Sequence, residues 1–514
     1  MSGRLDGTTI GVVGAGTMGA GIAQLAAQAG ARTLLHDAVP EGLQRGLAGI
    51  DRALARNVEK GRMTPDEAAA VRGRLEPVEA LEALEPCELV VEAAPERLDL
   101  KLDLFRRLAD IAGPECILAT NTSSLSVAEI AAGVPRPERV VGLHFFNPAP
   151  VMRLAEVVPG IATAPEVVAR AREVGEAMGK RVIDAADIPG FLVNRVNRPF
   201  FLESLRVLQE QLATVEQIDR IMRMAGGFRM GPFELMDLIG IETNHAVAEG
   251  FHRQTYGEPR YRPSPLAARM VAAGRLGRKT GQGWYRYDGN GAGHRPQDPE
   301  PPAAGGGDGR VLVVRGDLPV LGQLREAAAA AGWDVREDAA EPWLVVDGAA
   351  AGAAVAGPRA VLVHQASLHA LDPEAAGLHV VAPFEAARLV ELTRTPRTDA
   401  VAAERLEELV RTLGRHPEWV GDGAGLVLGR VVAQLVNEAA FLIGEGNGTP
   451  QDVDAGMQLG VNHPRGPVAW ADATGVAHVV AILDGLGDEL REERFRAAPL
   501  LRRRLALGVG LSGR

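Results

Sequence analysis

Apolar residues follow two different spacings along the first half of the chain. Short apolar runs, which are typical of buried strands, end in glycine or polar residues at 8–13, 32–36, 89–96, 116–120 and 139–146. Helical spacing of apolar residues lies between some of these runs, as at 20–30 and 41–73, and it replaces the strand pattern from about 190 to 284. The pattern predicts an α/β domain followed by an all-α domain.

The first apolar run leads directly into a glycine-rich turn and then into a helix. In such a unit the first glycine permits a tight turn, the second lets a pyrophosphate approach the backbone, and the third lets helix and strand pack closely. We therefore predict that the helix N-terminus holds a dinucleotide at Gly14, Gly16, Thr17, Met18 and Gly19.

Asp37 stands at the end of the second predicted strand. A carboxylate at this position accepts hydrogen bonds from the adenosine ribose and repels a 2′-phosphate, which favours NAD over NADP. The alternative is that Asp37 only caps the next turn.

Polar residues follow two further predicted strands. Cofactors and substrates bind at the carboxyl edge of a parallel sheet, so Glu92, Glu96 and Ser123 are candidates by position. Residues 121–124 are equally suited to capping a helix that starts near Ser126.

Residues 142–158, GLHFFNPAPVMRLAEVV, contain a candidate proton-transfer pair. His144 lies near the end of a predicted strand that prolines terminate, and Glu156 follows in the next apolar run. An imidazole and a carboxylate that meet beside a redox cofactor suit proton transfer near neutral pH. The alternatives are a core histidine and a solvated glutamate. Asn194 falls in the first turns of the next predicted helix, either in the site or bonded to backbone.

Length, charge and cysteine content narrow the class of protein. A chain of 514 residues is expected to form several domains. Its net charge of −11 argues against nucleic acid as a partner, because phosphate binding needs a concentrated basic face. Cys87 and Cys116 lack metal-ligand spacing, so we predict no metal site. No run resembles a signal peptide or a membrane span, so a cytoplasmic protein without a membrane partner is expected.

Seven motifs occur in order between residues 8 and 287: GAGTMGAGIA, VVEAAPE, NTSSLSV, GLHFFNPAPVMRLAEVV, PGFLVNRV, GPFELMDLIG and GRKTGQGWYRY. Together they resemble the L-3-hydroxyacyl-CoA dehydrogenase family. The resemblance implies an oxidoreductase that uses NAD to convert an L-3-hydroxyacyl-CoA to the 3-oxoacyl-CoA, in fatty-acid or phenylacetate-type degradation. It implies a Rossmann-type NAD-binding domain and a helical domain that helps to enclose the acyl-CoA. It leaves a homodimer open, since helical domains of this family commonly mediate dimers.

The resemblance also implies roles for single residues. His144 would be the catalytic base and Glu156 would orient its imidazole, while Ser123 and Asn194 would bond to the reacting oxygen or the nearby cofactor. Further positions that match family positions near NAD are Glu96, Lys101, Asn147 and Lys279.

The coenzyme A contacts depart from the family pattern. Gly46 and Ala53 stand where the family tends to place a serine and a lysine. Neighbouring basic residues, Arg52, Arg56 and Lys60, are therefore the candidates for binding coenzyme A.

A constant offset of 235 residues relates the two halves of the chain. It carries His144 to His379 and Glu156 to Glu391, and it continues through Arg195–Arg430, Glu203–Glu438, Asp219–Asp454, Asp237–Asp472 and Gly240–Gly475. This indicates an internal duplication. The copy has Ala382 and Gly429 at the positions of Asn147 and Asn194 and lacks the glycine turn. We therefore expect His379 and Glu391 to be structural, with no second NAD site.

The predicted architecture has four domains and a linker. Residues 1–187 would form the Rossmann domain, 188–287 the helical domain, 310–418 a degenerate Rossmann-like domain and 419–514 a second all-α domain. Residues 288–309, rich in glycine and proline, would be a flexible linker. Two other functions are also considered: a 3-hydroxyacid dehydrogenase that acts without coenzyme A, and a non-catalytic NAD-binding scaffold.

Overall fold

The computed structural model describes residues 5–288, 294–348 and 357–513. The chain forms two compact units, and each is described by itself. The first contains the residues up to Arg195 with Leu459–Val461, and the second contains Val196–Gln458 with Asn462–Arg514.

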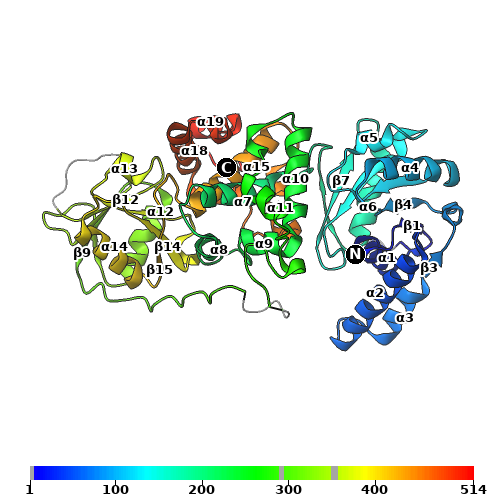
Figure 1. The fold of residues 1–514 in the computed structure, drawn as a ribbon, viewed down its shortest axis with the longest axis horizontal. Helices are drawn as coiled ribbons and strands as arrows, with labels where there is room; N and C mark the ends of the chain where they lie inside the picture. The colour runs from blue at the N-terminus through cyan, green and yellow to red at the C-terminus, as the bar shows by residue number, and fades with distance from the viewer. Residues whose placement is uncertain (1–4, 289–293, 349–356, 514) are drawn as a thin grey trace. The chain divides into compact units, whose positions relative to one another are not determined.

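The first unit is built on an eight-stranded sheet, blue to cyan in Figure 1, with the strand order β3-β2-β1-β4-β5-β6-β7-β8. Its strands are β1 (Thr9–Val13), β2 (Arg32–His36), β3 (Leu75–Val78), β4 (Leu89–Glu92), β5 (Ile117–Thr120), β6 (Val140–Phe145), β7 (Leu154–Pro159) and β8 (Arg181–Asp184). All neighbouring strands are parallel except β6 and β7. The connecting helices are α1 (Thr17–Gln28), α2 (Pro40–Glu59), α3 (Pro65–Gly73), α4 (Leu98–Ile111), α5 (Val127–Ala131) and α6 (Pro165–Ala177).

The helical stretch predicted at 41–73 is two helices. α2 ends at Glu59 and α3 begins at Pro65 after Thr64, whose hydroxyl accepts from the Glu67 amide while the Glu67 carboxylate accepts from the Thr64 amide. This capping box, with proline at the first helical position, starts a new helix. The signal was present in the sequence as Thr-Pro-Asp-Glu.

One face of the first sheet packs in a large apolar core with α1, α2 and α6. Val141, Leu143 and Phe145 of β6 belong to this core. Because strand side chains alternate between faces, His144 points to the opposite face of the sheet.

The second unit contains the rest of α7 (Val193–Gln209) and two groups of helices, green and orange to red in Figure 1. The first group is α8 (Val215–Met224), α9 (Pro232–Ile239), α10 (Ile241–Gln254) and α11 (Pro265–Ala272). The second group is α15 (Leu428–Gly444), α16 (Pro450–Gly460), α17 (Pro467–Thr474), α18 (Val476–Leu490) and α19 (Pro499–Leu507).

Buried ion pairs join α7 to α15 within this unit. Arg430 donates to Glu203 at 2.5 Å and to Glu210 at 2.5 and 2.9 Å. Burial alone would raise the pKa of Glu203, but Arg430, Arg494 and Arg206 hold this pKa at about 2. The carboxylate therefore stays charged inside the helical layer.

The second unit also holds a seven-stranded sheet in the order β10-β9-β11-β12-β13-β14-β15. Its strands are β9 (Val311–Arg315), β10 (Asp334–Arg336), β11 (Leu344–Asp347), β12 (Arg359–Leu362), β13 (Ala376–His379), β14 (Leu389–Thr393) and β15 (His416–Trp419), with helices α12 (Pro319–Ala330), α13 (Leu368–Leu371) and α14 (Ala400–Thr412). The single antiparallel pair among these described strands is β13 with β14. The two sheets thus have the same strand order, apart from β3.

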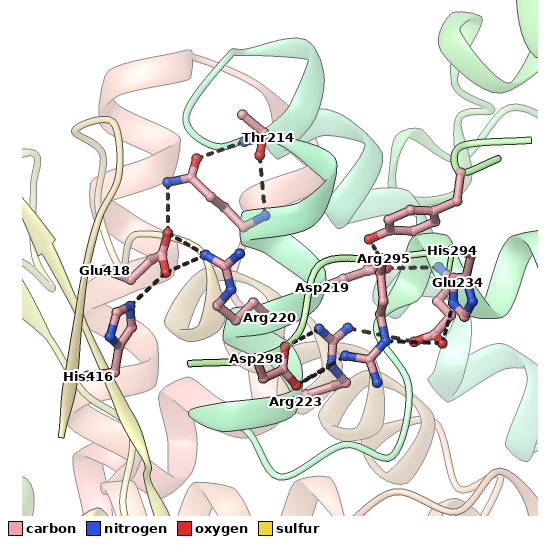
Figure 2. Close-up of polar contacts among 12 residues, drawn as sticks. Thr214, Asp219, Arg220, Arg223, Glu234, His294, Arg295, Asp298, His416 and Glu418 are labelled. Carbon is pink, nitrogen blue, oxygen red and sulfur yellow. Dashed lines mark hydrogen bonds and ion pairs between the residues drawn. The ribbon is translucent and has the colours of Figure 1, made fainter. Parts of the chain in front are cut away.

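The described part of the predicted linker, residues 294–309, contains neither helix nor strand but is anchored to the fold. Asp298 accepts hydrogen bonds from Arg223, at 2.6 Å, and from Arg295, and His294 lies 2.8 Å from Glu234. Figure 2 shows these contacts. Residues 289–293 lie outside the described residues. In the part of the chain that is described, no helix has the length and apolar character needed to cross a bilayer.

Candidate active site

Strands β6 and β7 place His144 directly opposite Glu156 in their antiparallel register. Nδ1 of His144 lies 2.7 Å from Oε2 of Glu156. A carboxylate can only accept here, so Nδ1 carries the proton, and in the neutral ring the lone pair is on Nε2. The geometry therefore leaves Nε2 as the basic atom of the pair.

The second oxygen of Glu156 binds the start of α7. Oε1 accepts from the amides of Leu192 at 3.2 Å and Val193 at 3.0 Å, and the carboxylate is fully buried. Helix N-termini favour anions because their amides and dipole point outward. Gly190 and Phe191 before these amides both have positive φ, 72° and 52°. A non-glycine residue in this region is uncommon, and here it directs the next amides toward Glu156.

The His144 side chain is mostly buried but keeps some exposure to solvent. Its residue is 6% exposed, and the rings of Phe146 and Phe191 lie 4.6 and 5.9 Å from it. Asn194 follows directly after Val193 in the first turn of α7 and is half-buried. The sheet and the helix start thus bring His144, Glu156 and Asn194 into one region of the first unit.

The glycine turn between β1 and α1 contains two kinds of glycine. A Cβ on Gly14 would lie 2.6 Å from the Ala93 carbonyl oxygen, and one on Gly19 would lie 1.7 Å from the Gly14 oxygen. A Cβ on Gly16 would meet no atom within 4 Å, and φ there is −65°. The fold itself requires Gly14 and Gly19, whereas Gly16 borders open space in front of the α1 N-terminus, where Thr17 is also exposed.

Asp37 lies beside this turn. Its Oδ2 accepts from the Ala15 amide at 2.7 Å, and its Oδ1 accepts from the Val39 amide at 2.9 Å. The residue therefore caps the turn that follows β2, as the alternative held, and also places a half-buried carboxylate next to the glycine turn.

Lys101, near the start of α4, binds the carboxylate of Glu92 at the end of β4. Its ammonium lies 2.6 Å from Glu92 and 3.3 Å from Glu96, and the side chains of Lys101 and Glu92 are almost completely buried. Thr120 also donates to Glu92, at 2.7 Å. The sequence predicts Glu92 as a candidate by its position alone and does not predict this buried cluster.

Glu96 organises the loop that contains Ser123. Its Oε1 accepts from the Thr122 hydroxyl at 2.6 Å, the Ser123 amide at 3.0 Å and both the amide and the hydroxyl of Ser124. Burial alone would raise the pKa of Glu96, but Lys101 and these donors hold this pKa below its usual range. The proposed helix cap at 121–124 is wrong, because Ser126 caps α5 by accepting from the Glu129 amide.

Two of the three predicted coenzyme A residues lie on an exposed face of α2, and the third follows directly after the end of this helix. Arg52, Arg56 and Lys60 are spaced by four residues and are all exposed. Gly46 is fixed by packing, since a Cβ there would lie 2.5 Å from the Ala15 oxygen.

The remaining predicted cofactor residues are exposed. Asn147 follows β6 in the first unit. Lys279 belongs to the second unit, where its ammonium forms an ion pair with Glu242.

The second sheet repeats the placement of the pair but not the bond. His379 faces Glu391 in the register of β13 and β14. Nδ1 of His379 has no hydrogen-bond partner among the described residues, and Nε2 lies 3.1 Å from Nε2 of His478 on α18. Burial, with His364 nearby, lowers the pKa of His379 to about 3. A Cβ on Gly429 would lie 2.0 Å from this ring, so only glycine leaves it room.

Glu391 is held at a helix start as Glu156 is. It accepts from the amides of Val427 and Leu428 at the start of α15. Burial outweighs these bonds and raises the pKa of Glu391 to about 8. The carboxyl group is therefore neutral at pH 7.

Comparison with known proteins gives matches over nearly the whole chain. A model of the 3-hydroxyacyl-CoA dehydrogenase NAD-binding domain matches residues 9–188, and a model of the C-terminal domain matches 190–287 and again 425–510. The chain is also 36% identical over 502 residues to an Escherichia coli (strain K12) protein named 3-hydroxyadipyl-CoA dehydrogenase, covering 98% of both chains. The chain belongs to the 3-hydroxyacyl-CoA dehydrogenase family.

Other members of this family are similar over all or half of the chain. A crystal structure of 3-hydroxybutyryl-CoA dehydrogenase from Escherichia coli K12 matches with a TM-score of 0.83 and 34% identity, covering 97% of this chain and 98% of that one. A Deinococcus radiodurans protein named probable 3-hydroxybutyryl-CoA dehydrogenase is 43% identical over 277 residues, which is 54% of this chain and 99% of the relative. The resemblance found in the sequence, and NAD as the cofactor, are thereby confirmed.

The two kinds of glycine predict different effects of adding a methyl group. Gly16→Ala should leave the free energy of unfolding within about 0.5 kcal/mol of the wild type, because the site is open and φ suits alanine. It should weaken NADH binding about tenfold or more, since the methyl group lies where a pyrophosphate approaches. Gly19→Ala should destabilise the fold by more than about 1 kcal/mol. Fluorescence titration and denaturant unfolding measure the two effects; unaltered NADH affinity in Gly16→Ala would place the pyrophosphate elsewhere.

The buried carboxyl of Glu391 predicts a pH dependence of stability. Its pKa is about 8 in the folded state and near 4.5 when unfolded, so between these values the folded state keeps a proton that the unfolded state has lost. The free energy of unfolding should then fall by about 1 kcal/mol as the pH rises from 7 to 8. Glu391→Gln should remove this slope, as urea unfolding at the two pH values would show. The low pKa of His379 makes the free energy of unfolding rise with pH instead, but only below pH 6.5. An equal slope in both proteins would mean that Glu391 is ionised.

Proposed function

We propose that this protein is an NAD-dependent oxidoreductase that converts an L-3-hydroxyacyl-CoA to the 3-oxoacyl-CoA, with His144 as the base. The observation that carries the proposal is the 2.7 Å bond from His144 to Glu156, whose other oxygen binds the start of α7 next to Asn194. Family membership supports the reaction class, and this geometry supports the assignment of the residues.

His144 is the group that moves the proton in the proposed reaction. Its Nε2 takes the proton of the substrate hydroxyl while the imidazole becomes a cation. Glu156 stabilises that cation through Nδ1 and fixes the ring orientation. Because Glu156 is also held by two backbone amides, it stays in place while the charge on the ring changes.

Ser123 and Asn194 are proposed to bond to the substrate oxygen. Both are half-buried polar residues, one after β5 and one in the first turn of α7. Their hydrogen bonds would polarise a ketone in the reducing direction and position a hydroxyl in the oxidising direction. The Glu96 carboxylate fixes the backbone on both sides of Ser123.

NAD, when bound, accepts the hydride that leaves the substrate carbon. We propose that the glycine turn holds its pyrophosphate and Asp37 its adenosine ribose. Gly16 supports this placement, because the fold gives no other reason for a glycine there. Asn147 and Lys279 are proposed to contact NAD directly. Glu96 and Lys101 are proposed to act mainly by shaping the loop around Ser123, since Lys101 is enclosed by carboxylates.

The exposed face of α2 is proposed to bind coenzyme A. Arg52, Arg56 and Lys60 present three positive charges along about two turns, which suits the phosphates of the coenzyme. The relatives named after 3-hydroxyadipyl-CoA and 3-hydroxybutyryl-CoA differ in one respect that bears on the acyl site. Only the former name describes an acyl chain that ends in a second carboxylate.

We further propose that the chain arose by internal duplication, with domains at 1–187, 188–287, 310–418 and 419–514 joined by the linker at 288–309. The shared strand order and the two matches to the C-terminal family model support this. Hydrogen bonds related by the offset of 235 support it further. Glu156 accepts from the amides of residues 192 and 193, and Glu391 accepts from those of 427 and 428. Asp219 likewise accepts from the amides of 233 and 234 and Asp454 from those of 468 and 469, and Phe191 and Leu426 both have positive φ.

The two histidines provide a matched test of the proposed base. His144→Gln should lower kcat for acetoacetyl-CoA reduction by about 1,000-fold, as expected for loss of a general acid–base group. His379→Gln should keep kcat within about threefold, because that ring bonds only to another buried histidine. NADH absorbance measures the rates, and circular dichroism checks that both variants are folded.

The same assay separates the proposed function from its alternatives. Wild-type turnover of acetoacetyl-CoA with little turnover of free acetoacetate is expected. Equal turnover of the free acid would support the dehydrogenase without coenzyme A, and a folded wild type inactive on both would support a scaffold. A His144→Gln variant with full activity would exclude His144 as the base.

A further inference from the structure

Arg198 on α7 is a buried cation for which the described residues provide no carboxylate partner. The residue is 4% exposed, and its Nε and Nη1 have no hydrogen-bond partner among the described residues. Two aromatic rings lie beside it: its guanidinium carbon is 5.4 Å from the centre of the Phe201 ring and 5.3 Å from that of Phe251. Burial lowers the pKa of Arg198 to about 10, which still leaves it charged at pH 7.

Two other buried arginines among the described residues have hydrogen-bond acceptors. Arg430 binds Glu203 and Glu210, and Arg139 donates to the backbone carbonyls of Gly113 and Ala109. An unpaired buried charge is costly, and two aromatic faces offset only part of that cost. A guanidinium held in this way is prepared for an anion that arrives with a ligand.

The position of Arg198 on α7 indicates which anion. It follows Asn194 by four residues on the same helix, so the two side chains lie on one face about 6 Å apart along the axis. In the proposed function Asn194 meets the oxygen on C3 of the acyl chain. A carboxylate that ends a six-carbon dicarboxylic chain is three carbon–carbon bonds beyond C3, within the span of one helical turn.

We propose that Arg198 binds the terminal carboxylate of a dicarboxylic 3-hydroxyacyl-CoA and thereby sets the substrate class. This rests on the proposed function. A carboxylate oxygen would accept a charge-assisted hydrogen bond from Nε or Nη1, the two donors that the described residues leave unbonded. An acyl chain that ends in a methyl group leaves Arg198 unpaired and gains nothing from it.

The test compares two substrates in Arg198→Met, whose side chain is similar in length but uncharged. The kcat/KM for NADH-dependent reduction of 3-oxoadipyl-CoA should fall about 100-fold or more, as expected when one partner of a buried charge pair is removed. The kcat/KM for acetoacetyl-CoA should change less than about threefold. The melting temperature should be equal or higher, because an uncompensated buried charge has been removed. Arg253→Met, an exposed arginine on α10, is the control and should change neither substrate.

The outcomes separate this inference from the proposed function. Equal loss for both substrates, no preference of the wild type for 3-oxoadipyl-CoA, or a strongly lowered melting temperature in Arg198→Met would overturn the role of Arg198. A wild type that reduces acetoacetyl-CoA would at the same time uphold the proposed function. A wild type that reduces neither substrate would overturn both.

Discussion

The buried carboxylate of Glu156 is the constraint on which the first unit depends. It binds His144 through one oxygen and the first amides of α7 through the other, so one side chain joins the sheet to the helix that carries Asn194. A buried carboxylate needs such hydrogen-bond donors. Here the donors are the His144 ring and the amides that precede Asn194, so their positions are fixed by the same carboxylate. The tautomer of His144, the turn at Phe191 and the position of Asn194 therefore have one common cause.

The second half meets the same constraint in a different way. Glu391 is bound to the helix start as Glu156 is, but it has no bond from His379, whose ring is turned toward His478. With fewer donors, burial prevails, and both groups are neutral at pH 7. Gly429, which stands 235 residues after Asn194, leaves the space that this ring occupies, since a Cβ there would lie 2.0 Å from it. The same residue types at the same spacing thus give a hydrogen-bonded pair in one half and a neutral, separated pair in the other.

Local patterns in the sequence predicted much of the fold. Strands β1, β2, β5 and β6 lie where apolar runs predicted them, and the glycine turn opens α1 as expected. The break between α2 and α3 was missed although its capping box is visible at Thr64. The cluster of Lys101 with Glu92 and Glu96 depends on how separate elements pack together. The exposure of Arg198 to aromatic rings rather than to a carboxylate also depends on which side chains the fold places around it. No periodicity or motif encodes either of these, so only the folded chain reveals them.

We propose that Glu156 acts through His144 by holding the proton on Nδ1. The most direct test is Glu156→Gln, whose amide oxygen can still accept from the α7 amides while its NH₂ group donates to Nδ1 and forces the other tautomer. We predict that kcat for acetoacetyl-CoA reduction falls about 1,000-fold or more, while KM for both substrates and the melting temperature change little. Unchanged kcat in the folded variant would contradict the account.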